Sequence, residues 1–273
     1  MKVFLLGAGK VGRALTRAIR RVGWAATLVP ARGRWPKKAI AADLIVLCVR
    51  DRDLVATAEG LVNAGIVPRR AACVHAAGAL GPEPLAALRG VCAGVGQMHP
   101  MISFASLTKF PTLARGQVHV QGDAVAVQRA RALAKKLGMS PRTIPKLDTV
   151  GYHAAAGLVA NGAAAHAAVG AELLVRSGVA PDVAPKMLGP LLRSVAENIE
   201  LLGFPDALTG PVRRGDAGAI GRQAALLRAR LPDAVPLFLA AARAQLPLAR
   251  AIGDAPADAF DAIARLLEGP EGA

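Results

Sequence analysis

A glycine-rich turn near the N-terminus constrains the fold of this chain more than any other feature. The apolar run at residues 3–6 leads into Gly7-Ala8-Gly9-Lys10-Val11-Gly12, and a helical pattern starts inside that motif. Glycines with this spacing allow a tight turn, the close approach of a diphosphate, and close packing of the helix on the strand. Free N–H groups at the helix N-terminus attract the anion. The motif therefore predicts a strand, turn and helix whose six turn residues bind a dinucleotide.

Short apolar runs alternate with helical patterns through the first half of the chain. The six runs that we interpret as strands are residues 3–6, 26–29, 44–49, 71–74, 92–96 and 117–120. Amphipathic stretches at residues 11–22 and 54–63 lie between them. This alternation indicates a mostly parallel sheet with crossover helices. We predict an α/β Rossmann domain over residues 1–147.

The pattern changes in the second half, where no further strand is evident. The expected helices are residues 151–176, 181–202, 217–231, 235–251 and 258–267. Asp182 and Asp216 stand where helix N-caps are expected. The run at residues 158–175 is long and apolar, but it contains polar residues, so we expect a buried helix rather than a membrane span. We predict an all-α domain over residues 148–268.

The segment after the second strand bears on the choice between the two nicotinamide cofactors. NAD enzymes usually place Asp or Glu about 20 residues past the glycine motif, on the ribose 2′-hydroxyl. This chain instead has Ala31-Arg32-Gly33-Arg34, with no acid nearby. We therefore predict NADP(H), with Arg32 as the first choice and Arg34 as the second for the 2′-phosphate. The alternative is that both arginines are solvated loop residues. The backbone of Val49 and Arg50, after the third strand, is expected beside the cofactor's ribose.

Two further strand ends carry histidines, and a third histidine opens the long helix. His75 and His99 follow predicted strands, at the edge where open α/β sheets bind ligands. An imidazole suits acid–base chemistry because its ordinary pKa is near neutrality. A structural role is an equal alternative for His99 and the favoured one for His75. His153 and Asn161 lie on one stripe of the long helix, about 12 Å apart along its axis, and a buried Asn161 would need a polar partner.

A polar, basic loop separates two of the expected helices. Thr209 and Arg214 lie in it, and a guanidinium there could bind a substrate carboxylate or phosphate. A helix-capping loop is the alternative, with Asp216 as the cap.

Four motifs in order resemble one family: residues 74–80, His99-Pro100-Met101, Tyr152-His153 through Asn161, and residues 208–216. They resemble the Rossmann-like proteins that carry the domain of unknown function 2520, over about residues 1–250. That family is related to pyrroline-5-carboxylate reductase, ketopantoate reductase and deazaflavin-dependent NADP oxidoreductases. Its second domain is similar to the C-terminal domain of 6-phosphogluconate dehydrogenase, and such domains commonly dimerise. The resemblance implies an NADP-dependent reductase or dehydrogenase without a settled substrate, and a homodimer formed by the helical domain. Our own hypothesis is hydride transfer between the nicotinamide and a small, anionic carbonyl, imine or hydroxy substrate.

Two departures from the relatives bear on the chemistry. Asn161 matches the Asn of the Lys-x-x-x-Asn pattern in 6-phosphogluconate dehydrogenase, but Gly157 stands where the Lys would be. Ala77 stands where relatives tend to have Ser. His99 and His153 are then the candidate proton donors, and the similarity of His99-Pro100-Met101 to prephenate dehydrogenase favours His99. A catalytically degenerate NADP(H)-binding sensor or scaffold remains the alternative function.

Composition narrows the classes of function that remain. Residues 1–120 hold 17 Lys and Arg against 5 Asp and Glu, which suits a polyanionic ligand or a solvated basic face. Aromatic residues are only 3%, and no nucleic-acid motif is present, so nucleic-acid binding is the least favoured function. The three cysteines have no metal-ligand or disulfide pattern. We expect no metal site and no membrane segment, and a cytoplasmic location.

Overall fold

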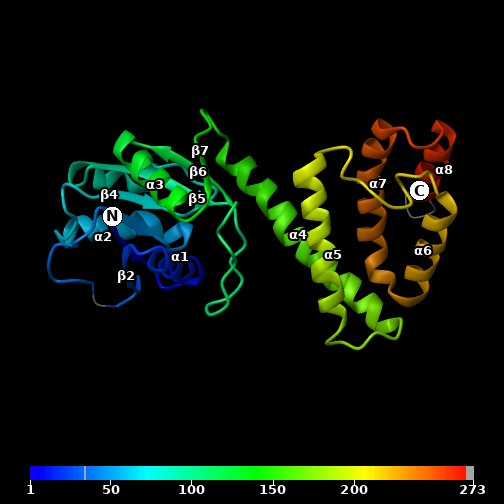
Figure 1. Cartoon of the computed structure of the whole chain (residues 1–273), viewed down its shortest axis with the longest axis horizontal. Helices are drawn as coiled ribbons and strands as arrows, with labels where there is room; N and C mark the ends of the chain where they lie inside the picture. The colour runs from blue at the N-terminus through cyan, green and yellow to red at the C-terminus, as the bar shows by residue number, and fades with distance from the viewer. Residues whose placement is uncertain (34, 269–273) are drawn as a thin grey trace. The chain divides into compact units, whose positions relative to one another are not determined.

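The computed structural model describes residues 1–33 and 35–268 (Figure 1). The chain divides into two compact units, Met1–Ala160 and Asn161–Ala273. Helix α4 (Thr149–Arg176) begins in the first unit and ends in the second.

The first unit contains a seven-stranded sheet. Its strands are β1 (Lys2–Leu6), β2 (Ala25–Val29), β3 (Leu44–Leu47), β4 (Ala72–His75), β5 (Gly94–Pro100), β6 (Gln117–Gly122) and β7 (Ser140–Arg142). Their order is β2-β1-β3-β4-β5-β6-β7, and only the β5–β6 pair is antiparallel. All six predicted strands are present, and the prediction of a mostly parallel sheet is confirmed. The short edge strand β7 was not predicted, because three residues ending in Pro141-Arg142 carry no strand periodicity.

Helices cover both faces of this sheet. On one face, α1 (Lys10–Arg21) and α3 (Ala124–Lys136) share a core with Val3 and Leu5 of β1. On the other face, α2 (Leu54–Asn63) and the 3₁₀ segment η2 (Glu83–Gly90) pack with Phe4 and Leu6. A strand buried on both faces is continuously apolar, which is why β1 shows no alternation in the sequence.

The strand order places a topological switch point at β1. The chain leaves β1 for β2 on one side and then crosses to β3 on the other. Open α/β sheets bind ligands at such a point, outside the carboxyl ends of the strands. The glycine turn that follows Leu6 and the short 3₁₀ segment η1 (Asp51–Asp53), which follows β3, both lie at this edge.

The second unit is helical, as predicted. After the second half of α4 it contains α5 (Ala184–Leu202), α6 (Ala217–Arg230), η3 (Pro232–Ala234), α7 (Val235–Ile252) and α8 (Ala257–Leu267). Helices α6, α7 and α8 lie side by side (Figure 1). They surround one core that includes Ile220, Ala242 and Phe260. The α/β unit and the following all-α unit confirm the fold class predicted from the sequence.

Of the two acidic residues predicted as helix N-caps, one caps a helix and the other does not. Asp216 caps α6, since its Oδ1 accepts a hydrogen bond of 2.8 Å from the backbone N–H of Ala219. Asp182 caps no helix, so that prediction is wrong: its carboxylate pairs with Lys186 Nζ at 2.9 Å, one turn along the chain. The N-cap of α5 is Val183, which has no capping side chain.

The prediction that the apolar run of α4 is buried is also wrong. No residue of this 28-residue helix is fully buried, and Leu158 is 79% exposed. By length and composition alone, α4 and the segment Pro232–Ile252 could each cross a membrane, which is weak evidence on its own. An Ala-rich helix shows little periodicity, so its buried and exposed faces are hard to distinguish from sequence.

Candidate functional site

Two positions of the glycine turn after β1 have no room for a side chain. Gly7 has φ of +120°, and a Cβ there would lie 2.3 Å from the carbonyl oxygen of Cys48. A Cβ at Gly12 would lie 1.9 Å from the carbonyl oxygen of Gly7. These two glycines therefore hold β1, β3 and α1 at their closest approach.

Gly9 has a different role, since a Cβ there would meet no atom within 4 Å. It is the N-cap residue of α1 and supplies no capping side chain. The first N–H groups of a helix have no intrahelical partner, so these donors face open space at the positive end of the helix dipole. Arg13 Nε donates to the carbonyl of Ala8 at 2.9 Å and holds the turn in place. The open space at Gly9 is what the predicted diphosphate site, which includes Ala8, Lys10 and Val11, would require.

The predicted 2′-phosphate ligands follow β2. Arg32 is exposed three residues after the end of this strand, while Arg34 lies outside the described residues. The loop is anchored by Trp35, whose Nε1 donates to the carbonyl of Ala31 at 3.1 Å and whose ring packs against Gly60 of α2. Because β2 is hydrogen-bonded to β1, Arg32 follows the strand that lies next to the glycine turn.

The end of β3 lies on the other side of the turn. The N–H of Cys48 donates to the carbonyl of Leu6 at 2.8 Å, which continues the β1–β3 pairing up to the turn. Val49 is half-buried and Arg50 is exposed at the start of η1. Both predicted residues are therefore at the carboxyl edge of the sheet, beside Gly7.

A second group of polar side chains occupies the same edge at β5. His99, the penultimate residue of β5, lies with its Nδ1 3.2 Å from the hydroxyl of Tyr152 in α4. The ring of His153 is edge-on to His99, with their centroids 5.7 Å apart. Three strand spacings, about 14 Å, separate β5 from β1, so a ligand on the glycine turn must extend across β3 and β4 to reach His99.

The turn after β4 lets these rings approach. A Cβ at Gly78 would lie 2.3 Å from His153 Nδ1 and 2.8 Å from His99 Nε2. The buried Gln97 holds this turn by donating from Nε2 to the carbonyl of Ala77 at 2.7 Å. Thr149 Oγ1, at the start of α4, donates to the carbonyl of Ala79 at 3.0 Å. The turn, β5 and the first turn of α4 therefore form one hydrogen-bonded cluster.

Burial determines the charge of this cluster. Desolvation, and after it the nearby imidazoles of His153 and His119, lower the pKa of His99 to about 4. Burial also raises the pKa of Tyr152. At neutral pH the pair is therefore an uncharged imidazole hydrogen-bonded to an uncharged phenol.

His75 has the structural role favoured from the sequence. Its Nε2 lies 2.6 Å from the carbonyl of Gly81, and its Nδ1 accepts from the N–H of Ala77 at 3.2 Å. Both ring nitrogens are thus used to close the turn after β4, and burial lowers the pKa of the ring.

Two residues of the cluster were not predicted as site residues from the sequence. Tyr152 was noted only as a motif residue, and His119 in β6 was not singled out. His119 is the register partner of His99 in the antiparallel pair, and its ring centroid lies 5.7 Å from that of Tyr152. It is buried, and among the described residues neither of its ring nitrogens has a hydrogen-bond partner. The signal available in the sequence was an imidazole inside an apolar strand, but only the antiparallel pairing places it opposite His99.

The remaining predicted residues lie in the second unit. Asn161 is exposed on α4, so the expectation of a buried amide is wrong. Thr209 and Arg214 are exposed in the loop before α6. The neighbouring Arg213 has the structural role there, because it donates to Asp254 Oδ2 at 2.5 Å and to the carbonyl of Leu208 at 2.8 Å. Arg214 is thereby left as the solvent-facing guanidinium of the loop.

These features define a Rossmann-type α/β protein with a helical second unit. The family model described as "Domain of unknown function (DUF2520)" matches residues 117–245. This match confirms the resemblance stated from the sequence motifs over those residues. No curated protein gives a significant match to the sequence.

Solved structures share the fold at low identity. A candidate NADP oxidoreductase from Bacteroides fragilis aligns with a TM-score of 0.68 and 21% identity, covering 89% of this chain and 97% of that one. A protein from Thermotoga maritima aligns with a TM-score of 0.64 and 19% identity, covering 91% and 98%. Pyrroline carboxylate reductase from Plasmodium falciparum, solved with NADP bound, aligns with a TM-score of 0.60 and 12% identity, covering 90% and 98%. At these identities the likeness shows the fold of both units.

The lowered pKa of His99 predicts a specific dependence of stability on pH. An unfolded histidine titrates near 6.5, so between pH 6.5 and about 4 the unfolded chain binds a proton that the folded chain does not. We expect His99 to remove about 2 kcal/mol of unfolding free energy across that window after screening by solvent. His99→Asn should flatten the profile by this amount. Urea unfolding at pH 7 and pH 4.5 measures it, and both tryptophans, Trp24 and Trp35, report on the first unit.

The matched control is His166→Asn, an exposed histidine on α4 in the second unit. It should leave the pH profile of the first unit unchanged. Equal profiles for wild type and His99→Asn would show that His99 is not held neutral by the fold.

Proposed function

We propose that the protein is an NADP(H)-dependent oxidoreductase that transfers hydride between the nicotinamide and a small, anionic carbonyl, imine or hydroxy substrate. The observation that carries the proposal is the pairing of two sites on one sheet edge: an open helix N-terminus at Gly9 and an uncharged His99–Tyr152 pair. The solved structures of the same fold include a candidate NADP oxidoreductase and a pyrroline carboxylate reductase with NADP bound, which supports the choice of reaction class.

The residues of the first site fit a phosphorylated dinucleotide. The N–H groups of the first turn of α1 would hold the diphosphate, and Arg32 would bind the 2′-phosphate because a guanidinium matches a phosphate in geometry and charge. The backbone at Val49 and Arg50 would border the ribose. When bound, NADPH would supply the hydride, and the protein's own groups supply positioning and the proton.

Proton delivery falls to Tyr152 and His99. At neutral pH His99 is uncharged, so it acts as a relay rather than as an imidazolium acid. The Tyr152 hydroxyl gives its proton to the substrate oxygen or nitrogen, and His99 Nδ1–H restores it. In the same step His99 Nε2 takes up a proton from solvent past the exposed ring of His153, so no imidazolate forms. The imidazole changes tautomer and never needs to carry a charge, which suits a buried site.

Three further residues are proposed for the substrate. Arg214 would bind its carboxylate or phosphate, Thr209 would donate a hydrogen bond, and Asn161 would orient the substrate or the carboxamide of the cofactor. The sensor or scaffold alternative keeps the first site and lacks turnover, in line with Gly157 and Ala77 at positions where relatives have Lys and Ser.

Cofactor binding tests the first site. Calorimetry should show NADPH bound more tightly than NADH by at least about tenfold, and Arg32→Ala should remove that preference while leaving NADH affinity unchanged. Arg69→Ala, an exposed arginine that precedes β4 at the opposite edge of the sheet, is the control and should change neither affinity. Absence of binding by either nucleotide would remove the enzyme proposal.

Turnover tests the second site. On a panel of small carbonyl and imine acids, Tyr152→Phe should lower kcat about 100-fold with unchanged NADPH affinity, because proton transfer by a positioned group contributes at least that much. His99→Asn should do the same, and His166→Asn on α4 should leave kcat unchanged. If Tyr152→Phe keeps full activity, the relay is wrong. If no panel member is reduced although NADPH binds, the sensor alternative is favoured.

We also propose that the protein is a cytoplasmic homodimer assembled through α5. Met187, Leu191, Val195 and Ile199 follow one another at four-residue intervals on this helix and are 38–57% exposed. Residues four apart share a helix face, and only Ala184 of the whole helix is buried. A second copy presents the same stripe, so a two-fold axis would cover both at once. Asn161, His166 and the Glu172–Arg176 ion pair make α4 a poor membrane span.

Charge placed in the stripe should therefore separate the copies. Sedimentation equilibrium in buffer without detergent should give a dimer for the wild type and a monomer for Leu191→Glu. Leu226→Glu, on the 40% exposed Leu226 of α6, should remain dimeric. The proposal is contradicted if the wild type is still monomeric at about 100 µM, a concentration at which a dimer of micromolar dissociation constant would form. It is also contradicted if the wild type is soluble only in detergent.

A further inference from the structure

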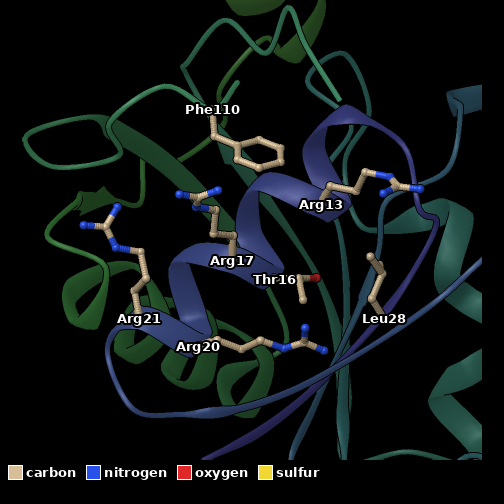
Figure 2. Close-up of a pocket in the computed structure, with 7 residues that line it drawn as sticks. All are labelled: Arg13, Thr16, Arg17, Arg20, Arg21, Leu28 and Phe110. Atoms are coloured by element: carbon tan, nitrogen blue, oxygen red, sulfur yellow. The ribbon is translucent and has the colours of Figure 1, made fainter. Parts of the chain in front are cut away.

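Helix α1 carries a dense group of cations on its solvent face. Its sequence holds Arg13, Arg17, Arg20 and Arg21 and no acidic residue. Together with Thr16, Leu28 and Phe110 they line a hollow of about 470 Å³. Figure 2 shows Arg13 and Arg20 extending to the side of Leu28, and Arg17 and Arg21 extending to the other side, with Phe110 over the helix. A second hollow of about 280 Å³ shares Arg17, Arg21 and Phe110 and adds Lys109.

Three of the four guanidiniums are held in position by other parts of the fold. Arg13 Nε donates to the carbonyl of Ala8 at 2.9 Å, and Arg20 Nε and Nη2 donate to the carbonyl of Ala26 at 3.1 and 2.9 Å. Arg17 lies over the ring of Phe110, 5.5 Å from its centroid. In each case N–H donors of the guanidinium remain available, because these contacts use at most two of its five. Groups already fixed in place lose less entropy when they bind a ligand.

The charges of this group are not balanced within the described part of the chain. None of the four arginines forms an ion pair there, whereas Arg89, Arg176, Arg213 and Arg250 each pair with an acid. Arg13 and Arg17, and Arg17 and Arg21, are like-charge pairs one helical turn apart, which destabilises a helix. A bound polyanion would remove that repulsion.

We propose that this α1 groove is a second ligand site, which binds a small molecule carrying two or more linked phosphate groups. Guanidiniums match phosphate oxygens in pairs, and cations on both sides of Phe110 suit more than one phosphate. The combined hollows have the size of small-molecule sites. The apolar floor from Leu28 and Phe110 leaves room for a planar or aliphatic part of the same ligand.

The groove is distinct from the dinucleotide site proposed above. Neither hollow is lined by Gly7, Gly9, Lys10 or Arg32. Arg13 and Thr16 contact the glycine turn, through the carbonyls of Ala8 and Gly12. A ligand in the groove would therefore lie along the outer face of α1, while a dinucleotide would lie at its N-terminus.

The test is calorimetry of the full chain with inorganic tripolyphosphate at about physiological salt, where weak surface ion pairing is screened. We expect one saturable site. Arg17→Gln together with Arg21→Gln should weaken binding about tenfold or more. The control, Arg222→Gln with Arg228→Gln, removes the same charge from exposed positions of α6 and should change affinity less than about twofold. Both double variants should keep the wild-type thermal midpoint within a few degrees, because all four side chains are exposed.

Four results would overturn the proposal. Equal losses in the two double variants would mean binding by net charge alone. Orthophosphate binding as tightly as tripolyphosphate would exclude a site for linked phosphates. Competition by NADPH would assign tripolyphosphate to the glycine turn. The fourth result concerns a mixed-sequence single-stranded RNA of about 20 nucleotides. If it binds more tightly than tripolyphosphate, and if the Arg17 and Arg21 substitutions abolish that binding, the ligand is a nucleic acid.

Discussion

The contact between the glycine turn and β3 sets the geometry on which the proposed dinucleotide site and the proposed α1 groove depend. Gly7 and Gly12 have no side chain at positions where a Cβ would overlap the carbonyl oxygens of Cys48 and Gly7. This brings the N-terminus of α1 down onto the junction of β1 and β3, where the strand order reverses. The outward face of α1 is oriented by the same contact, so its arginines project away from the sheet while Leu15 and Ile19 pack against it.

The proposed dinucleotide site and the proposed proton-transfer site lie apart along the same edge of the sheet. The glycine turn is at β1, and His99 is three strands away at β5, in a cluster closed by hydrogen bonds from Gln97 and Thr149. Burial holds both His99 and Tyr152 in their neutral forms at neutral pH. A neutral relay is the proton chemistry that such a site allows, because charging the imidazole there is costly.

Helix α5 differs from the helices of the first unit in how few of its residues are buried. The first unit has two cores, one on each face of the sheet, whereas α5 in the second unit buries a single residue. Such a helix gains little from its own unit, since most helical stability comes from packing an apolar face. Its exposed stripe is therefore an argument for association.

Local patterns in the sequence were enough to predict the fold class, the six main strands, the five helices of the second half and the glycine turn. These depend on residues close together in the chain: apolar runs, helical spacing, and glycines between a strand and a helix. The cap at Asp216 was predicted for the same reason, whereas Asp182 fits the same local pattern and instead pairs with Lys186. What only the tertiary structure decided are contacts between distant segments. The antiparallel β5–β6 pair sets His119 opposite His99, α4 brings Tyr152 to the same imidazole, and the loop with Phe110 covers the arginines of α1. No local pattern encodes such contacts, because they follow from the order of strands and the packing of helices on the sheet.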